Sequence, residues 1–417
     1  MDASRRVVVS GIGLCTPLGD GCETNWSRLI RGDSGLRWLE ESYRNRYPGS
    51  ENLPPGVRAG GPANEPTRNE LSQTGEKVIA LAIRAAAEAF NDARLAEDKT
   101  DPWRSGVVIG TSKGGLRSFE KFVKQGHELP DEGAATLWQE FWSNTPAQML
   151  AQRYQFLAAA LCPVAACATG LVSIQRGAEL IQQGLCDVVL AGSTDASLLP
   201  VLQGSFHRLG VLAKNFNNPE SACRPFDRDR EGFLVGEGAA VLVLEDAERA
   251  ASRGVKPYAE WLGGGIVSDG TGLTQLEPNS PAMQHLLESL PSLAGFDWNE
   301  VDYLNLHGTG TVMNDECEAA ALLSALGEHA ERIPASSLKG TFGHLLGAAG
   351  SVETALTLLA WKHKQLPANR NLATPFTGCR LNLLRDPRPI ESPRVAVKLS
   401  LGFGGHLTAG CFRSLEK

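Results

Sequence analysis

The sequence lacks a run of apolar residues long enough to cross a bilayer, so no transmembrane helix is expected. Its start, MDASRRVVVSGIG, is basic, but the apolar part is too short for the core of a signal peptide. We therefore expect a cytoplasmic protein. Low-complexity tracts are also missing, and 42% hydrophobic with 21% charged residues is typical of a chain that buries a large core.

An excess of positive charge is missing as well. The chain has 40 Lys and Arg against 47 Asp and Glu, which gives a formal net charge of −7. This balance excludes a nucleic-acid binder that depends on its overall charge. An acidic protein partner would need a local basic patch on this chain.

The nine cysteines are an odd number, and they show neither CxxC pairs nor Cys/His finger spacing. This pattern disfavours a disulfide framework and a structural zinc site. A dinucleotide-binding fingerprint is also missing. We therefore expect no metal and no redox cofactor, and most cysteines should be small buried residues of a reduced protein.

What the 417 residues do contain is an alternation of short β-branched runs and longer helical patterns, which predicts a layered α/β protein. Strands are expected at 6–11, 106–110, 187–192, 240–244, 257–267, 301–306 and 394–403. Helices are expected at 77–93, 171–183, 281–289, 312–326 and 348–364. The polar, irregular stretches 41–69 and 128–143 are expected to be surface loops.

This alternation restarts after Arg253 and Gly254, which predicts two related halves, 1–254 and 255–417, packed as one body. An internal echo supports a duplication. The same pattern occurs twice: small residues, then a predicted helix, then polar residues that end it. The two segments are ACATGLVSIQRGAELIQQG at 166–184 and GHLLGAAGSVETALTLLAWKHKQ at 343–365. A length of 417 residues fits such a duplicated α/β body.

Cys167 lies among Ala, Thr and Gly residues just before one of these predicted helices. Small neighbours allow a tight strand-to-helix turn, and a helix N-terminus favours the thiolate by lowering the pKa of the thiol. The alternative is a cysteine that merely packs in the core, which is the usual outcome for a lone cysteine. Cys162, five residues earlier, shows how common such residues are here.

Two histidines lie in glycine-rich turns at element boundaries. His307 follows a predicted strand in VDYLNLHGTGT, and His344 precedes a predicted helix in KGTFGHLLGAAG. Ligands bind at the carboxyl ends of such strands, so the pair favours acid–base or hydrogen-bonding chemistry over a structural role. Lys339 lies in the same loop as His344, and Glu353 lies inside an apolar helix where a carboxylate needs a partner. Lys339 is the expected partner.

Taken together, these segments resemble one family. Along the chain they run AACATG, PFDRDREGFLVGEGAAVLVLE, HGTGTVMNDECE, KGTFGHLLGAAGSVE and GFGG. This order is similar to that of the β-ketoacyl-acyl-carrier-protein synthases, the elongating condensing enzymes of fatty-acid and polyketide synthesis (KAS I/II type or type II polyketide ketosynthases). The likeness extends from Val7 to the C-terminus and implies the thiolase fold, two similar halves stacked as α-β-α-β-α.

The resemblance implies that Cys167 is the nucleophile that accepts the acyl chain. His307 and His344 match the two histidines that bind the malonyl thioester carbonyl and promote loss of its carboxylate. Lys339 matches the lysine of the second histidine's loop, and Glu353 matches the glutamate of the following helix.

Four further residues match the family's pattern. Phe403 in GFGG matches the gating phenylalanine, whose N–H with that of Cys167 is expected to hold an oxyanion. Thr309 and Thr311 match the threonines that hold the phosphopantetheine arm, and Asp315 matches the loop aspartate. The implied reaction is a decarboxylative Claisen condensation that extends a Cys-bound acyl chain by two carbons.

The implied partner is an acyl carrier protein, with a homodimer or a heterodimer of a related subunit. Arg208 and Lys214 are candidates for its docking patch, although a solvated surface role is equally consistent with the sequence. Val312 after HGTGT, His406 and Leu407 after GFGG, and Lys113 in GTSKGGL depart from the family's usual residues. These departures favour a specialised pathway, such as type II polyketide or polyene synthesis.

Three other functions fit the same fold. A non-catalytic chain-length-factor subunit typically lacks the nucleophilic cysteine, so Cys167 together with both histidines argues against it. A thiolase uses a second cysteine near the C-terminus; Cys411 lies there but outside a matching motif. Starter-unit synthases replace one histidine by asparagine, which His344 opposes.

Overall fold

The core of the protein is a continuous path of hydrogen-bonded strands in which one five-strand pattern occurs twice. The coordinates are a computed structural model that describes residues 5–39, 43, 47–98, 100–125, 139–277 and 280–415. The first pattern has the order β6-β5-β7-β8-β1, and the second has the order β11-β10-β15-β16-β9. In both, the first three strands run parallel and the last two are antiparallel to their neighbours.

The strands of the first pattern are β1 (Val7–Thr16), β5 (Ser105–Gly110), β6 (Ala160–Leu161), β7 (Val188–Asp195) and β8 (Gly238–Asp246). Those of the second are β9 (Ala259–Ser268), β10 (Val301–Asn305), β11 (Pro334–Ser336), β15 (Val395–Gly402) and β16 (His406–Ser414). A three-residue pairing of β1 with β9 joins the two sheets. The repeated order supports our proposal that the chain is built from two halves, 1–254 and 255–417.

Two central helices fill the space between the sheets. They are α9 (Thr169–Gln182), which contacts β7 and β16, and α16 (Ala349–Lys362), which contacts β8 and β15. Every residue of α16 from Ala349 to Trp361 is buried, because the helix is covered on all sides by the sheets and by α9. Most of its residues are apolar for the same reason, and its polar residues Ser351, Glu353, Thr354 and Thr357 are buried with them.

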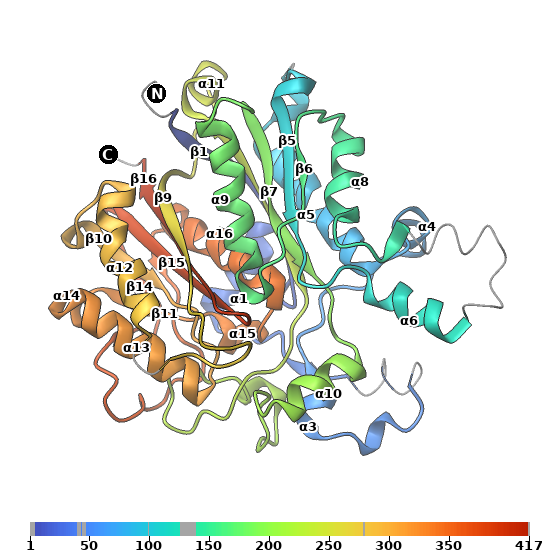
Figure 1. Ribbon diagram of the computed structural model, residues 1–417, viewed down its shortest axis with the longest axis vertical. Helices are drawn as coiled ribbons and strands as arrows, with labels where there is room; N and C mark the ends of the chain where they lie inside the picture. Colours follow the sequence, from blue (N-terminus) through green and yellow to red (C-terminus); the bar gives the residue numbers. More distant parts are fainter. Residues whose placement is uncertain are drawn as a thin grey trace.

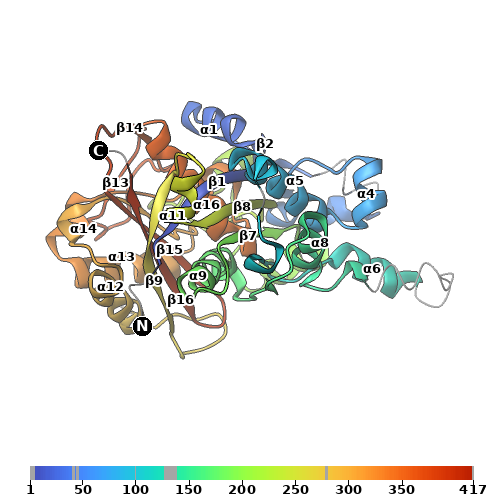
Figure 2. The same ribbon diagram turned by 90° about the horizontal axis from the view of Figure 1, so that it is seen from above.

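Outer helices complete five layers, as Figures 1 and 2 show. On the outer side of the first sheet lie α5 (Lys77–Asp92) and α8 (Thr145–Tyr154), and on that of the second lie α12 (Pro281–Ala294) and α13 (Val312–Leu326). The α-β-α-β-α stacking expected from the sequence is therefore confirmed. The predicted strands and helices are all present, with boundaries displaced by a few residues.

The remaining elements are short. The helices are α1 (Cys22–Arg31), α3 (Pro55–Arg58), α4 (Arg68–Thr74), α6 (Leu116–Gln125), α10 (Pro200–Arg208), α11 (Ala247–Ser252), α14 (Glu328–Arg332) and α15 (Lys339–Phe342). The strands are β2 (Gly19–Asp20), β3 (Arg37–Trp38), β4 (Ala59–Gly60), β12 (Gln365–Leu366), β13 (Asn382–Leu383) and β14 (Arg388–Pro389). Across the described ranges, no helix has the length and apolarity that a membrane span requires.

One sequence expectation for the loops was wrong in part. The stretch 41–69, expected to be irregular, contains α3, strand β4 and the start of α4. β4 pairs with β3, and α3 packs against α10, which removes much of this segment from solvent. Most of the second expected loop, 128–138, lies outside the described residues.

The duplication extends to the turns that precede the central helices. Ala166 opens a single 3-10 turn before α9 with φ of 46°, and Leu346 opens the same kind of turn before α16 with φ of 50°. Positive φ is rare for residues with a Cβ atom, so both turns are strained at equivalent places. Cys167 therefore corresponds to Gly347 in the second half, and His344 lies three residues before that position.

Candidate active site

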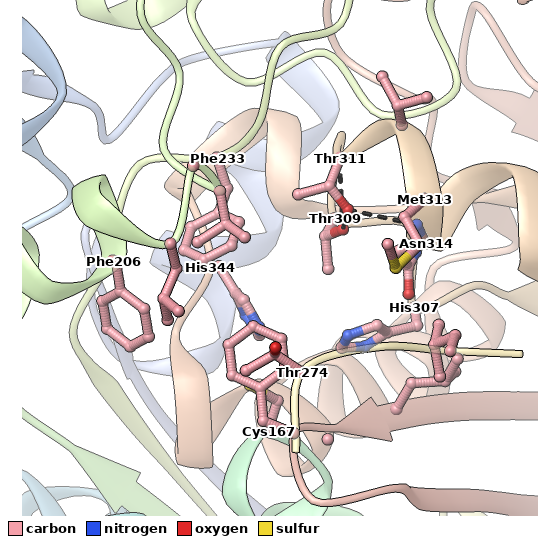
Figure 3. Close-up of a pocket in the computed structure, with 18 of the residues that line it drawn as sticks. Cys167, Phe206, Phe233, Thr274, His307, Thr309, Thr311, Met313, Asn314 and His344 are labelled. Carbon is pink, nitrogen blue, oxygen red and sulfur yellow. Dashed lines mark hydrogen bonds between the residues drawn. The ribbon is translucent and has the colours of Figure 1, made fainter. Parts of the chain in front are cut away.

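A cavity of about 600 Å³ brings together the residues that the sequence singled out. Cys167, His307 and His344 all line it, although they come from three separate segments of the chain. Figure 3 shows the two imidazoles approaching from different sides, with Cys167 below them. The other side chains of the wall include Phe206, Phe233, Leu273, Thr274, Leu276, Thr309, Thr311, Met313, Asn314, Leu346, Leu401 and Phe403.

The turn that carries Cys167 depends on a close contact with the end of β15. A Cβ atom at Gly402 would lie 2.6 Å from the carbonyl oxygen of Ala165 and 3.2 Å from the nitrogen of Cys167. Only glycine allows the two backbones to approach this closely. The contact lets the main-chain N–H of Phe403, the next residue, donate a hydrogen bond to the Cys167 sulfur.

Burial dominates the acidity of this thiol. It raises the pKa of Cys167 to about 11, while the charges of Lys113 and Lys339 and the Phe403 N–H oppose the rise. The sequence-based prediction of a lowered thiol pKa is therefore wrong, because desolvation of the thiolate outweighs the favourable groups around it. Without substrate, Cys167 is therefore a neutral thiol, and the nearby positive charges and the Phe403 N–H favour its ionisation.

Two lysines oppose the rise in the pKa of Cys167, and the charge of Lys113 has a larger effect than that of Lys339. Its side chain is half-buried, its ammonium donates a 2.7 Å hydrogen bond to the Ser112 hydroxyl, and it lies 5.8 Å from the centre of the Phe206 ring. Because Phe206 lines the cavity, the charge lies behind the cavity wall near the sulfur. The resemblance to the family placed Lys113 at a usually small or apolar position near the acyl tunnel, and in the structure its charge lies close to Cys167.

Removing this charge should slow the reaction of Cys167 with iodoacetamide at pH 8. In Lys113→Met the thiol pKa should rise further, so the thiolate fraction and the alkylation rate should fall by about threefold to tenfold. The rate can be followed by peptide mass mapping of Cys167. Lys121→Met, which removes an exposed lysine of α6, should leave the rate unchanged; an equal rate in wild type and Lys113→Met would contradict the electrostatic assignment.

The two imidazoles lie edge to face, with ring centroids 5.4 Å apart and an interplanar angle of 79°. His307 follows β10 at its carboxyl end, and its main-chain N–H donates to Glu318 Oε1 at 2.7 Å. His344 follows α15, and its N–H donates to the Leu234 carbonyl at 2.8 Å. Both backbones are therefore fixed by hydrogen bonds from other segments.

The tautomer of His344 follows from its surroundings. Its Nδ1 accepts a hydrogen bond from the Leu346 N–H at 3.3 Å, so the ring proton is on Nε2. Phe233 holds the ring from the side, with centroids 5.0 Å apart. The strained turn at Leu346 is what aims this N–H at the imidazole.

Both histidines are neutral at physiological pH. Burial is the largest cause that lowers the pKa of each well below its usual range, followed by the positive charge of Lys339. A neutral imidazole can donate one N–H to an oxygen in the cavity without adding a full positive charge there. Two such donors facing one space can stabilise negative charge that develops on a thioester oxygen.

Lys339 connects this pair to the interior. Its ammonium binds the carbonyl oxygen of His307 at 2.5 Å and Glu353 Oε1 at 2.7 Å, and all its atoms are buried. The predicted pairing of Lys339 with Glu353 is confirmed. A second lysine, Lys398 of β15, lies 2.7 Å from the other oxygen of Glu353, and no sequence pattern had pointed to it.

The loop after His307 carries the two predicted threonines. Thr309 and Thr311 line the cavity, and their hydroxyl oxygens lie 2.9 Å apart. Asp315 is fully buried and is absent from the cavity wall; it accepts N–H groups of Phe226 at 2.7 Å and Gly310 at 3.1 Å. It therefore shapes the loop from behind.

The GFGG segment is the tight turn between β15 and β16. Gly404 and Gly405 have φ of 90° and 78°, which residues with a Cβ rarely adopt, and half-buried Phe403 lines the cavity. His406 pairs with Gly402 at the start of β16, and Leu407 is buried in the core of the second half. The two residues that depart from the family are thus parts of a strand.

Family models match both halves of the chain. One described as the N-terminal domain of beta-ketoacyl synthase matches residues 4–250, and one described as its C-terminal domain matches residues 258–373. The chain belongs to the β-ketoacyl synthase family. The synthase is therefore a condensing acyltransferase, as its sequence motifs indicated.

Relatives of the synthase come from two branches. The 3-oxoacyl-[acyl-carrier-protein] synthase 2 of Rhizobium meliloti is 34% identical over 96% of this chain and 97% of its own length. The tetracenomycin polyketide synthase ketoacyl synthase alpha subunit of Streptomyces glaucescens is also 34% identical, over 98% and 96%. The equal identities do not separate fatty-acid from polyketide synthesis.

A solved structure confirms the thiolase-like ketosynthase fold of the synthase. It is described as a type II polyketide synthase acyl-carrier protein in complex with its ketosynthase bound to the hexaketide. The match has a TM-score of 0.90 and 30% identity, and it covers 99% of this chain and 100% of the other.

The two residues predicted to dock an acyl carrier protein differ in their position relative to the cavity. Lys214 is exposed and lines the outer part of the cavity, whereas Arg208, at the end of α10, is exposed but absent from the cavity wall. The sequence also missed Phe206, Phe233 and the segment 273–276, which form much of the wall. These residues lie in a helix and in loops, and no sequence signal distinguishes residues that line a cavity from residues in ordinary packing or at the surface.

Proposed function

We propose that this synthase extends an acyl chain bound to Cys167 by two carbons, taking them from a malonyl thioester on an acyl carrier protein. The observation that carries the proposal is the convergence of one sulfur and two neutral imidazoles on a single cavity of about 600 Å³. A cavity of this size accommodates the end of a phosphopantetheine arm and a short acyl chain.

In the first half of the reaction, the sulfur of Cys167 attacks the carbonyl carbon of an acyl-carrier thioester. The N–H of Cys167 in the strained turn and that of Phe403 after β15 are the proposed donors to the oxyanion. The carrier's C–S bond breaks, and its sulfur leaves as a thiol that takes the proton given up by Cys167. The acyl chain is then held by the enzyme as a thioester.

In the second half, the malonyl thioester enters along Thr309 and Thr311. The C–C bond to its carboxylate breaks, CO₂ leaves, and the electron pair forms an enolate on the thioester oxygen. His307 and His344 donate hydrogen bonds to this oxygen, each worth roughly 3 kcal/mol in the transition state. The enolate carbon attacks the acyl carbonyl, and the sulfur of Cys167 leaves and is protonated.

The structure favours this function over two of the alternatives. A non-catalytic chain-length-factor subunit does not need a cysteine on a strained turn that faces two buried imidazoles. A thiolase needs a second cysteine at the site, whereas Cys411 is fully buried in β16 and does not line the cavity. Burial also raises the pKa of Cys411 well above its usual range.

Within the family, we propose that the synthase acts in a type II polyketide or polyene pathway. The charge of Lys113 behind the cavity wall supports this, because a buried alkyl chain gains nothing from a nearby positive charge, whereas the carbonyl dipoles of an oxygen-bearing chain can be stabilised by it. The test offers acyl-carrier thioesters of graded length, saturated or bearing oxygen, and measures the acyl mass on the enzyme. Loading of saturated medium and long chains in preference to oxygen-bearing ones would contradict the polyketide assignment.

The proposed protein partners are an acyl carrier protein at Lys214 and a second ketosynthase-fold subunit at the edge of the first sheet. Among the described residues β6 pairs only with β5, and Leu157 and Val164 on either side of it are 47% and 56% exposed. An open strand edge flanked by apolar side chains suits pairing with another strand. Light scattering of the purified chain should give the mass of a dimer that Val164→Asp weakens; a wild-type monomer would assign the edge to a related subunit instead.

A further inference from the structure

The least explained group near the site is Lys398. It lies on β15, four residues before Gly402, and its ammonium is 2.7 Å from Glu353 Oε2. The ammonium of Lys339 is 2.7 Å from Oε1 of the same carboxylate. All three side chains are fully buried. Removing an ion from water costs several kcal/mol, so a second buried cation on one carboxylate needs a reason.

Charged and titratable groups face Lys398 from each element that packs around it. Glu353 comes from α16, Lys339 from α15 and Glu318 from α13, and all of them are fully buried. On the neighbouring strand β10, the Tyr303 hydroxyl lies 2.6 Å from Ser336 Oγ and near Glu353, and His307 follows just beyond the strand. Lys398 is therefore part of a buried network that joins three helices and two strands and reaches His307.

The contacts of this network also connect the position of Lys398 with that of His307. Lys398 occupies one oxygen of Glu353, which leaves the other oxygen for Lys339. Lys339 in turn binds the carbonyl oxygen of His307, so a shift of the Glu353 carboxylate would move the point that supports this histidine. The geometry of His307 over the cavity thus depends on a residue that does not touch the cavity.

We propose that Lys398 is a positioning residue for the decarboxylation step: it fixes Glu353 and thereby Lys339 against His307, and its positive charge adds to the surroundings that disfavour an imidazolium. This inference rests on the proposed function, since it assigns Lys398 to the malonyl half of that reaction. Neutrality matters because an imidazolium would form an ion pair with the malonyl carboxylate. That ion pair would stabilise the ground state that must lose CO₂.

The protonation of the neighbouring groups agrees with this role. Burial is the largest cause that lowers the pKa of His307 and of His344, and the charge of Lys339 comes next for both. Lys113 acts on His344 as well, and Lys398 adds a smaller effect on both imidazoles. Burial also lowers the pKa of Lys398 itself to about 8, against the opposing effect of Glu353. Below pH 8 the charge of Lys398 adds to burial and to Lys339 in disfavouring the imidazolium forms, so its contribution should be visible on the acid side of the pH profile.

The experiment measures CO₂ release from a malonyl-carrier thioester by the full chain between pH 5 and pH 9. In Lys398→Met the histidine pKa values should rise, so the acid-side midpoint should move up by about half to one pH unit. At pH 5.5, activity relative to pH 8 should fall by about threefold or more. Acyl loading of Cys167 is measured in the same samples as a check on folding.

Lys398→Gln keeps a hydrogen-bond donor toward Glu353 but removes the charge, so it should show the same shift even if the Met variant folds poorly. Ser400→Ala is the matched control, because Ser400 is a fully buried residue on the same face of β15 and lies outside the network. Its profile should equal that of wild type. Lys398→Arg, which retains the charge, should keep the wild-type midpoint.

Two results would overturn the assignment. A uniform loss of activity with an unchanged midpoint in both charge-removing variants would show that Lys398 only supports the fold. A profile that superimposes on wild type would show that it has no effect on the step. If wild-type enzyme loads Cys167 but releases no CO₂ at any pH, the proposed function itself fails, and the role of Lys398 fails with it.

Discussion

Replacing Cys167 with alanine should abolish acyl loading and chain extension, reducing product formation by at least about 10³-fold, because no other described side chain of the cavity wall is a comparable nucleophile. CO₂ release from a malonyl thioester should persist in this variant. The two imidazoles that stabilise the enolate come from the second half of the chain and are held by hydrogen bonds that do not involve the sulfur.

The measurement is the intact mass of the enzyme after incubation with an acyl-carrier thioester. Wild type should gain one acyl group that maps to the peptide containing Cys167, and Cys167→Ala should gain none. The matched control is Cys223→Ala, since Cys223 is fully buried in the same half and is absent from the cavity wall. Acyl transfer to another residue in Cys167→Ala, with normal extension, would refute the role of Cys167.

Removing either imidazole should impair a different half of the reaction: CO₂ release should fall while acyl loading of Cys167 remains. His307→Ala and His344→Ala should each lower CO₂ release by about 10²-fold to 10³-fold, the usual cost of losing one preorganised donor to an oxyanion. Loading of Cys167 should be largely retained. The His307 variant keeps the main-chain oxygen that binds Lys339, so its loss reports on the ring alone.

The two variants differ in their structural side effects. His344→Ala also removes the acceptor of the Leu346 N–H, so its loss of activity should be accompanied by a small loss of stability. His363→Ala is the control, because His363 stacks on Trp26 outside the cavity wall. Equal CO₂ release in wild type and His307→Ala would contradict the proposed stabilisation of the enolate.

Periodicity was sufficient to predict a layered α/β protein, whereas the five-layer stacking was implied by the resemblance to the family. Strands such as β7 and β8 are buried runs with several valines, and the repeated pattern of small residues before a helix pointed to the similar turns at Ala166 and Leu346. A cysteine and two histidines at element boundaries could be selected because such boundaries meet at the same end of a layered α/β fold. That these three side chains meet in one cavity could not be derived from sequence patterns, because it depends on how the two sheets pack against each other.

Other features could not be predicted, for physical reasons. The acidity of Cys167 depends on how much water the surrounding segments exclude, which no local motif encodes. Lys398 interrupts an apolar strand pattern, and only the packed structure shows that it points to Glu353. Asp315 lies close in sequence to the cavity loop, yet its side chain is used to bind backbone N–H groups behind it.

The most direct test of the central claim is a single-turnover experiment with enzyme whose Cys167 has been loaded with one acyl group. After addition of a malonyl-carrier thioester, the acyl mass should leave the enzyme at the rate at which CO₂ and a β-ketoacyl thioester two carbons longer appear, one of each per acyl group lost. Release of the acyl group as a free acid, or CO₂ without an extended chain, would contradict the claim that one sulfur and two imidazoles act on the same pair of substrates.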